Sequence, residues 1–246
     1  MDRLLYVAMT GASQTMLAQA ANNNNLANAS TTCFRADLSA FRAMPVFGPG
    51  APSRVYAMAE RPGTDYSYGS LLATGRDLDV AVKGEGWIAV QGPDGREGYT
   101  RAGDLRVSTS GLLENGAGHL VLGNSGPIAI PPAEKIEIGA DGTLSIQPVG
   151  QSATSLAVLD RIKLVNPPLQ DLMKGSDGLM RTKDDSVLPP DAAVGLSAGT
   201  LEASNVNPVD AMVNMISLAR QFEMQVKMMR TSQENDASAA QILRMS

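Results

Sequence analysis

The stretch that decides the fold runs from Asn207 to Arg244 and reads NPVDAMVNMISLARQFEMQVKMMRTSQENDASAAQILR. Asn207 is a preferred helix N-cap residue, Pro208 suits the first helical position, and Asp210 places a negative charge in the positive first turn. Neither proline nor glycine occurs after Pro208 in this stretch, so the helix is predicted to continue to its end. At a rise of about 1.5 Å per residue it would be about 55 Å long, which exceeds the span of a compact domain built from the middle of the chain.

The apolar residues of this predicted helix fall mainly on one face at helical spacing. That face contains Met212, Met215, Ile216, Leu218, Ala219, Phe222, Val226 and Met229, continued more weakly by Ala237, Ala240 and Leu243. A second line, formed by Val213, Met224 and Met228, lies where solvent is expected. The second line suggests more than one helical neighbour, although an ordinary surface also tolerates methionine.

A second helix is predicted from Arg3 to about Leu26, with an apolar line formed by Leu5, Met9, Ala12, Met16 and Leu26. The two terminal helices could pair as a coiled coil. Alanine and methionine dominate the pairing faces, so such a pair would be loosely specified. Two ordinary surface helices packed on one core would give the same periodicity.

The segment that follows is predicted to lack helix. The run Asn22–Asn25 favours turns, so the first helix should fray or end there, unless the asparagines form a polar face stacked on neighbours. Between residues 33 and 75 the prolines and glycines predict an extended connector, formed around Pro45, Gly48, Pro49, Gly50 and Pro52.

Short alternating strands separated by turns begin at Asp77. The clearest hairpin joins Ile136 and Ile138 to Leu144 and Ile146 through the turn at 139–142. The predicted fold is therefore α+β, with long N- and C-terminal helices and a mainly antiparallel β central domain. Its segments are an N-terminal helix (1–32), an extended connector (33–75), a β-rich domain (76–200) and a C-terminal helix (201–246).

Composition argues against several classes of function. Charged residues make up 18% of the chain and its net charge is −5, so the basic footprint of a nucleic-acid-binding protein is missing. Aromatic content is only 4%, which suggests stability borrowed from partners. No apolar run approaches the roughly 20 residues of a membrane span, and the N-terminus does not resemble a cleavable signal. We expect the protein either to stay in the cytosol or to leave without signal cleavage.

The chain has few residues suited to catalysis. His119 and Cys33 are its only histidine and cysteine, which is too few for a conventional zinc site or a Cys/His nucleophile pair. A dinucleotide-binding glycine motif is followed by a helix that holds the pyrophosphate. Gly84-Glu85-Gly86 is followed by a predicted strand, so it does not form such a site. A paired-carboxylate hydrolase stays open, but no pattern supports one. We predict no enzymatic activity, no cofactor and no metal.

Three stretches together resemble the bacterial flagellar axial (rod and hook) protein family. They are Asn24-Asn25-Leu26-Ala27-Asn28 with 30–35, where Cys33 replaces the usual glycine; 77–87 with Tyr99-Thr100-Arg101-Ala102-Gly103-Asp104; and 201–209 continuing to Arg220-Gln221-Phe222-Glu223. This resemblance covers nearly the whole chain. The opening MDRLLY and the length are most similar to proximal rod members, with distal rod members as the main alternative.

The resemblance implies a structural subunit of the basal-body rod, a part of the flagellum that spans the periplasm. It implies export through the flagellar type III apparatus without signal cleavage, and other proximal and distal rod subunits as partners. It also implies that the terminal helices form an inner coiled-coil layer, with the β domain outside. The residues expected at the assembly interface are Leu5, Met9, Met16, Asn24, Asn25, Leu26, Asn28, Asn205, Asn207, Pro208, Met212, Ile216, Ala219, Phe222, Val226 and Met229.

Two classes of function therefore remain. The first is a self-assembling polymer subunit that transmits torque, without a direct membrane span or nucleic-acid partner. The alternative is a soluble adaptor module whose helices dock on one partner.

Overall fold

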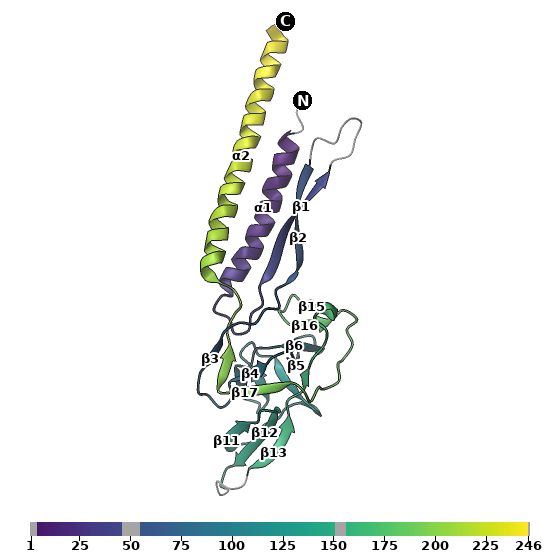
Figure 1. Cartoon of the computed structure of the whole chain (residues 1–246), viewed down its shortest axis with the longest axis vertical. Coiled ribbons are helices and arrows are strands. Elements are labelled where there is room, and N and C mark those ends of the chain that lie inside the picture. The colour runs from purple at the N-terminus through teal and green to yellow at the C-terminus, as the bar shows by residue number, and fades with distance from the viewer. Residues whose placement is uncertain (1–3, 46–54, 151–155, 246) are drawn as a thin grey trace. The chain divides into compact units, whose positions relative to one another are not determined.

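The computed structural model describes residues 4–45, 55–150 and 156–245. Helix α1 spans Leu4–Ala27 and helix α2 spans Pro208–Met245 (Figure 1). Three sequence predictions lie outside the described residues: the opening residues 1–3, the proline and glycine run at 48–52, and the side chain of Leu243.

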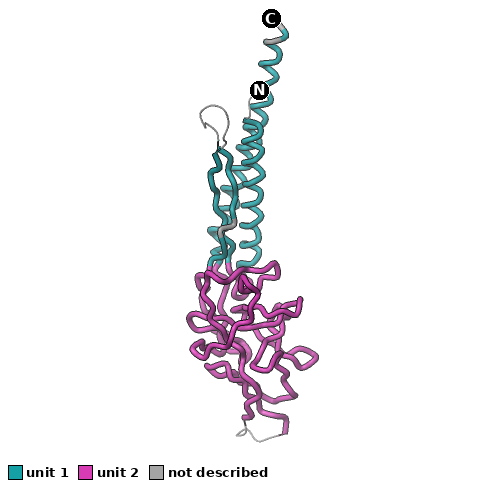
Figure 2. Tube along the Cα trace, turned by 90° about the vertical axis from the view of Figure 1, so that its right-hand side faces the viewer, with its two compact units in different colours: residues 1–29, 36–65, 206–246 teal, residues 30–35, 66–205 magenta. Residues whose placement is uncertain are grey.

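The chain divides into two compact units (Figure 2). Unit 1 comprises residues 1–29, 36–65 and 206–246, and unit 2 comprises residues 30–35 and 66–205. These boundaries divide the expected connector, because residues 36–65 belong with the helices, whereas 33–35 and 66–75 belong to unit 2.

Unit 1 contains the two helices and one β-hairpin (Figure 1). Helices α1 and α2 lie side by side and antiparallel, and the hairpin of β1 (Asp37–Pro45) and β2 (Val55–Thr64) contacts α1. The Ala59 amide donates to Oε1 of Gln14 at 2.8 Å. The segment that we expected as an extended connector thus contains two paired strands, whose ladder satisfies their backbone hydrogen-bonding groups.

The asparagine run lies within α1, which continues through it to Ala27. Asn22 Nδ2 donates to the Ala211 carbonyl at 2.8 Å, at the beginning of α2. Asn25 Nδ2 donates to the Asp37 carbonyl at 2.8 Å, and Asn25 Oδ1 accepts from the Asp37 amide at 2.9 Å. The asparagine run therefore forms a polar face that contacts neighbouring segments, and the helix also ends near it, at Ala27.

Helix α2 begins as its sequence predicts. Asn207 Oδ1 accepts from the amides of Val209 at 3.0 Å and Asp210 at 3.5 Å, which is N-cap geometry. Pro208 is the first helical residue, where its missing N–H has no intrahelical partner to lose.

Unit 2 is built from short antiparallel strands, which confirms the predicted class of the central domain. The described residues form a nine-stranded sheet in the order β15 (Leu172–Lys174), β16 (Met180–Thr182), β6 (Glu97–Thr100), β5 (Trp87–Gln91), β9 (Leu120–Gly123), β8 (Leu113–Asn115) and β7 (Leu105–Val107), with β10 (Gly126–Pro127) beside β9 and β14 (Leu164–Val165) beside β5. A three-stranded sheet has the order β11 (Ala133–Ile138), β12 (Thr143–Pro148), β13 (Ala157–Arg161). Two further pairs are β17 (Gly195–Ala198) with β4 (Val80–Lys83) and β18 (Thr200–Glu202) with β3 (Leu71–Ala73), and a 3₁₀ turn spans Leu169–Asp171.

The hairpin prediction is confirmed in register, since Ile138 pairs with Leu144 and Ile136 with Ile146. Gly142 in the turn has φ 85°, a conformation that favours glycine. The segment 157–165 contains two strands with different partners, because β13 pairs with β12 whereas β14 pairs with β5.

The core of unit 2 lies on both faces of β5. Ile88 and Val90 belong to the larger apolar cluster, whereas Trp87 and Ala89 belong to a second cluster with Tyr99. Successive side chains of a strand point to opposite faces, so β5 is buried on both sides. Unit 2 therefore has a well-filled core of its own.

Candidate functional site

The buried face of α1 consists of small residues at heptad spacing. The buried residues are Ala8, Gly11, Ala12, Thr15 and Ala18, and all but Ala12 follow one another at intervals of three and four residues. A Cβ added to Gly11 would lie 3.0 Å from the Gln225 side chain of α2. The small residues therefore allow the two helices to approach closely.

The buried face of α2 follows the same spacing. A series of its covered positions alternates intervals of four and three residues: Ala211, Met215, Leu218, Phe222, Gln225, Met229 and Ser232, with Ala219, Gln221 and Val226 half-buried beside it. Ala211 and Ser232 are buried and the other five of the series are half-buried. All residues from 233 onward whose burial is described are exposed, so α2 continues past the part that α1 covers.

Large apolar side chains lie on the outer faces of both helices. Each is at least 44% exposed: Tyr6, Met9, Met16 and Leu17 on α1, and Val209, Met212, Val213, Ile216, Met224 and Met228 on α2. We call these ten residues the outer apolar face. Among the described residues of unit 1, by contrast, no leucine, isoleucine, valine, phenylalanine or methionine is buried.

The structure separates the residues predicted for the assembly interface into distinct environments. Met9, Met16, Met212 and Ile216 lie on the outer apolar face, and Asn24, Asn207 and Pro208 are also exposed. The half-buried members are Leu5, Asn25, Leu26, Asn28, Asn205, Ala219, Phe222, Val226 and Met229. Asn205 belongs to unit 2, where its Nδ2 donates to the Ser67 carbonyl at 3.1 Å.

Sequence reasoning missed the small residues that line α1. The signal was present, since Ala8, Gly11, Thr15 and Ala18 keep the intervals of three and four. The larger side chains of Met9 and Met16 gave the stronger periodic signal. Gly11 lies where α1 approaches the Gln225 side chain closely.

A buried charge cluster in unit 2 was also missed. Glu202 is 1% exposed and receives Arg35 Nη2 at 2.5 Å on Oε1 and Arg101 Nε at 2.7 Å on Oε2. Burial acts to raise the pKa of Glu202, but the hydrogen bonds from Arg101 and Arg35 outweigh it and the net pKa lies below its ordinary value. The Gly69 amide adds a third donor at 3.0 Å.

Cys33 lies beside this cluster in a left-handed conformation, with φ 56°. Its thiol donates to the Arg101 carbonyl at 2.7 Å and lies 3.3 Å from the Glu202 carbonyl oxygen. Burial raises the pKa of this thiol to about 12, helped by the negative charge of Glu202. The glycine that the family usually has here would adopt this backbone without steric cost.

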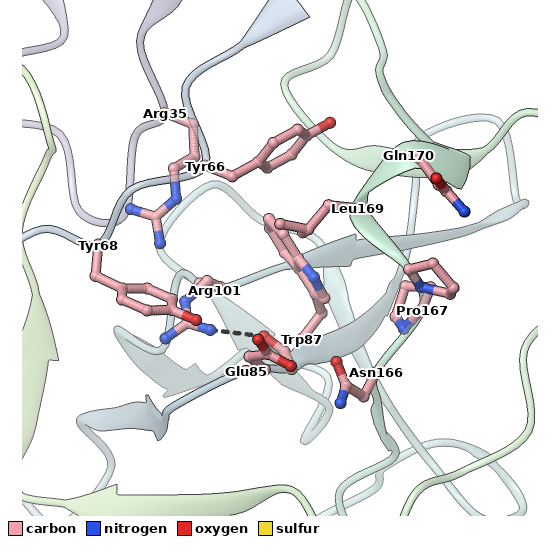
Figure 3. Close-up of a pocket in the computed structure, with 12 residues that line it drawn as sticks. Arg35, Tyr66, Tyr68, Glu85, Trp87, Arg101, Asn166, Pro167, Leu169 and Gln170 are labelled. Atoms are coloured by element: carbon pink, nitrogen blue, oxygen red, sulfur yellow. Dashed lines mark hydrogen bonds between the residues drawn. The ribbon is translucent and has the colours of Figure 1, made fainter.

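A pocket of about 530 Å³ opens beside the cluster (Figure 3). Its walls include the aromatic side chains of Tyr66, Tyr68 and Trp87. The ring of Tyr68 lies over both guanidinium groups, 4.8 Å from Cζ of Arg101 and 5.9 Å from Cζ of Arg35. The pocket thus combines cationic and aromatic groups.

The described ranges contain neither a cluster suited to a metal ion nor a helix suited to span a membrane. There, no group of three or more His, Cys, Asp or Glu side chains is arranged to hold a metal ion. Neither described helix is both long and apolar enough to cross a membrane.

Comparison with known proteins gives the family. Residues 197–242 match the family described as flagellar basal body rod FlgEFG protein C-terminal. Residues 81–146 match the flagellar hook protein FlgE/F/G D1 domain.

Curated relatives match over nearly the full chain. The flagellar basal-body rod proteins FlgF of Escherichia coli (strain K12) and of Salmonella typhimurium are each 44% identical, over 100% of both chains. FlgF of Caulobacter vibrioides is 32% identical over 99% of this chain and 98% of its own, and FlgG of Bacillus subtilis is 30% identical over 95% and 96%. With a paired-helix unit, an antiparallel β unit and these full-length similarities, the chain belongs to the flagellar basal-body rod protein family of FlgF.

Proposed function

We propose that this chain is a structural subunit of the bacterial flagellar basal-body rod that assembles through the outer apolar face of α1 and α2. One observation carries the proposal: ten large apolar side chains of α1 and α2 lie on the outer apolar face, while the fully buried apolar residues of unit 1 among those described are small. Full burial of a methionine, leucine or isoleucine stabilises by about 1.5–3 kcal/mol, and unit 1 gains little of this within one chain. Neighbouring subunits would supply the missing burial.

The two helices form a coiled-coil pair in this proposal. The intervals of three and four on both buried faces support it, because this spacing keeps one face toward a partner helix. The part of α2 beyond Ser232 has no counterpart on α1 and is free to contact other subunits.

The chain's location and partners follow from this role. We infer that it reaches the basal body through the flagellar type III export apparatus without signal cleavage, and that it joins proximal and distal rod subunits. We propose a place in the proximal part of the rod, with the distal part as the alternative. The role is that of a structural protein rather than an enzyme, and torque passes through the packed helices.

The experiment replaces exposed methionines of the outer apolar face with glutamine and leaves the buried residues of unit 1 unchanged. Two double variants, Met9→Gln with Met16→Gln and Met224→Gln with Met228→Gln, are tested in a bacterium whose own copy is deleted. Both should reduce swimming and the yield of complete rods seen in purified basal bodies, because each subunit loses apolar contacts with its neighbours. Val158→Gln on β13 is the matched control, since Val158 is an exposed apolar residue of unit 2.

Normal swimming and normal basal bodies in both double variants would refute assembly through this face. If the deletion itself leaves rods intact, the chain is not a rod subunit, and the adaptor alternative becomes the better explanation.

A further inference from the structure

Trp87 has a hydrogen-bond donor that no described residue uses. The residue is 5% exposed, and its ring meets the ring of Tyr66 edge to face, with the centroids 6.3 Å apart. Its indole Nε1 has no acceptor among the described residues, although a buried tryptophan N–H usually finds one. Unlike Nε and Nη1 of Arg35, this unpartnered nitrogen is not sealed from solvent. The donor is therefore open to the pocket that Trp87 lines.

Other polar groups of the pocket can also donate. Figure 3 shows the indole nitrogen on the edge of its ring toward Asn166 and Pro167. The side-chain amides of Asn166 and Gln170 and the hydroxyl of Tyr68 belong to the same lining, and each has N–H or O–H groups to offer. A ligand with several carbonyl oxygens and few N–H groups would match this set of donors.

The charges of the pocket favour an uncharged acceptor. Glu85 is exposed on the pocket wall, so it would repel an anion. Arg101 donates from each of its three nitrogens to Glu202 or to backbone carbonyls, and the two unused nitrogens of Arg35 are out of reach of a ligand. A carboxylate or phosphate would thus meet Glu85 without a free guanidinium donor to hold it. A peptide carbonyl is the acceptor that fits.

The walls of the pocket favour proline as the residue that carries this carbonyl. Trp87 and Tyr66 stand at 90° to one another, and Pro167 and Leu169 add further apolar surface. Proline has an apolar ring and no N–H, and a polyproline II segment leaves its carbonyls free because it forms no internal hydrogen bonds. Such segments bind aromatic-lined grooves with little loss of conformational entropy. An ordinary segment would bring one N–H per residue to a pocket that mainly offers donors.

We propose that this pocket binds a proline-rich segment of a neighbouring protein in the polyproline II conformation, with Nε1 of Trp87 donating to one of its carbonyls. That the neighbour is another rod subunit rests on the function proposed above. The binding itself does not, because it is measured on the isolated full-length chain. Failure of binding and failure of rod assembly are therefore distinguishable.

Trp87 provides the signal for the experiment, since it is the one tryptophan of the chain and gives a single indole N–H resonance in ¹⁵N-labelled protein. The full-length chain is titrated with three capped peptides: acetyl-Ala-Pro-Pro-Pro-Ala-amide, its all-alanine counterpart, and acetyl-Ala-Ala-Phe-Ala-Ala-amide. The proline peptide should move the indole proton downfield in a saturable manner, because the N–H gains an acceptor. Both other peptides should bind at least about tenfold more weakly.

Two variants test the pocket residues by calorimetry with the proline peptide. Trp87→Phe keeps an apolar ring and removes the donor, so it should weaken binding about fivefold. Leu169→Ala removes part of an apolar wall and should weaken binding about threefold. Leu72→Ala is the matched control, because Leu72 on β3 (Leu71–Ala73) is similarly exposed and does not line the pocket. Thermal unfolding close to that of the wild type shows that each variant is folded.

The proposal is overturned if the proline peptide gives no saturable shift, or if the alanine peptide binds equally well. Unchanged affinity in both Trp87→Phe and Leu169→Ala would place the binding elsewhere and would also overturn it. Tighter binding of the phenylalanine peptide would identify an aromatic side chain as the occupant, and would refute a proline-rich segment.

Discussion

The residue Glu202 links three segments that are far apart in the sequence. It accepts from Arg35, from Arg101 and from the Gly69 amide, all within unit 2. Removing one partner from a buried ion pair is costly because it leaves a charge without compensation. Glu202 therefore fixes how the segments 30–35 and 66–69 join the β unit.

Glu202→Gln should lower the free energy of unfolding of unit 2 by about 3–5 kcal/mol near neutral pH. The folded pKa of Glu202 lies below its ordinary value of 4.5, so its contribution is present above that value and is lost as pH falls through the folded pKa. Urea unfolding followed by Trp87 fluorescence should show the gap between variant and wild type narrowing below about pH 4.5.

The control for this prediction is Glu137→Gln, whose ion pair with Lys135 is exposed and should contribute little to the free energy of unfolding. A gap between Glu202→Gln and wild type that stays constant down to acidic pH would contradict the role of the Glu202 charge.

Cys33 offers a matched pair of substitutions. Cys33→Gly and Cys33→Ala both remove the thiol and its contact with the Arg101 carbonyl, but only glycine relieves the left-handed backbone at φ 56°. The glycine variant should be more stable than the alanine variant by about 1 kcal/mol. Urea unfolding of both proteins checks this. An alanine variant at least as stable as the glycine variant would mean that the left-handed backbone at residue 33 has no cost for a residue with a Cβ.

At the scale of elements, the helix pair depends on close approach at Gly11. Gly11→Ala should raise helix content, because alanine favours helix by about 1 kcal/mol and the flexible end of Gln225 can move away from the new Cβ. Gly11→Leu should lower helix content, since overpacking costs about 1–3 kcal/mol. Far-ultraviolet circular dichroism compares the variants.

Ser13→Leu is the control for Gly11→Leu, because Ser13 is exposed on the same helix. Equal helix content in the two leucine variants would mean that α1 does not pack on α2 through Gly11.

Elements with strong local signals could be predicted from sequence. Helix α2 has a cap and no interior breaker, and the hairpin of β11 and β12 has a glycine turn with alternating residues. The strands between 169 and 203 are hard to predict from sequence, because three or four residues are too few to show alternation.

The candidate sites were harder to predict than the elements. The line of Val213, Met224 and Met228 was predicted to face solvent and is exposed, but Met212 and Ile216, which were predicted on the main apolar face, are exposed too. The buried face of α1 depends on which residues are small enough for close approach rather than on which are most apolar. The partners of Glu202 come from distant segments, and no local pattern records such a contact.

At the scale of the whole molecule, the two units differ in how they are stabilised. Unit 2 buries large side chains in two clusters, including Ile88, Leu105 and Leu144 at 0% exposure. In unit 1 the apolar residues that are buried among those described are alanines: Ala8, Ala12, Ala18 and Ala211. Burial of so little apolar area offsets only a small part of the conformational entropy lost when two helices order.

We therefore expect the free monomer to keep unit 2 folded while α1 and α2 open readily. Amide hydrogen exchange on a dilute sample, verified as monomeric by ultracentrifugation, should show strong protection at β5 and weak protection along both helices. In assembled rods the helix amides should become protected, because neighbours then cover the outer apolar face. If both helices are as protected as β5 in the verified monomer, unit 1 is stable alone and its surface does not need neighbouring subunits.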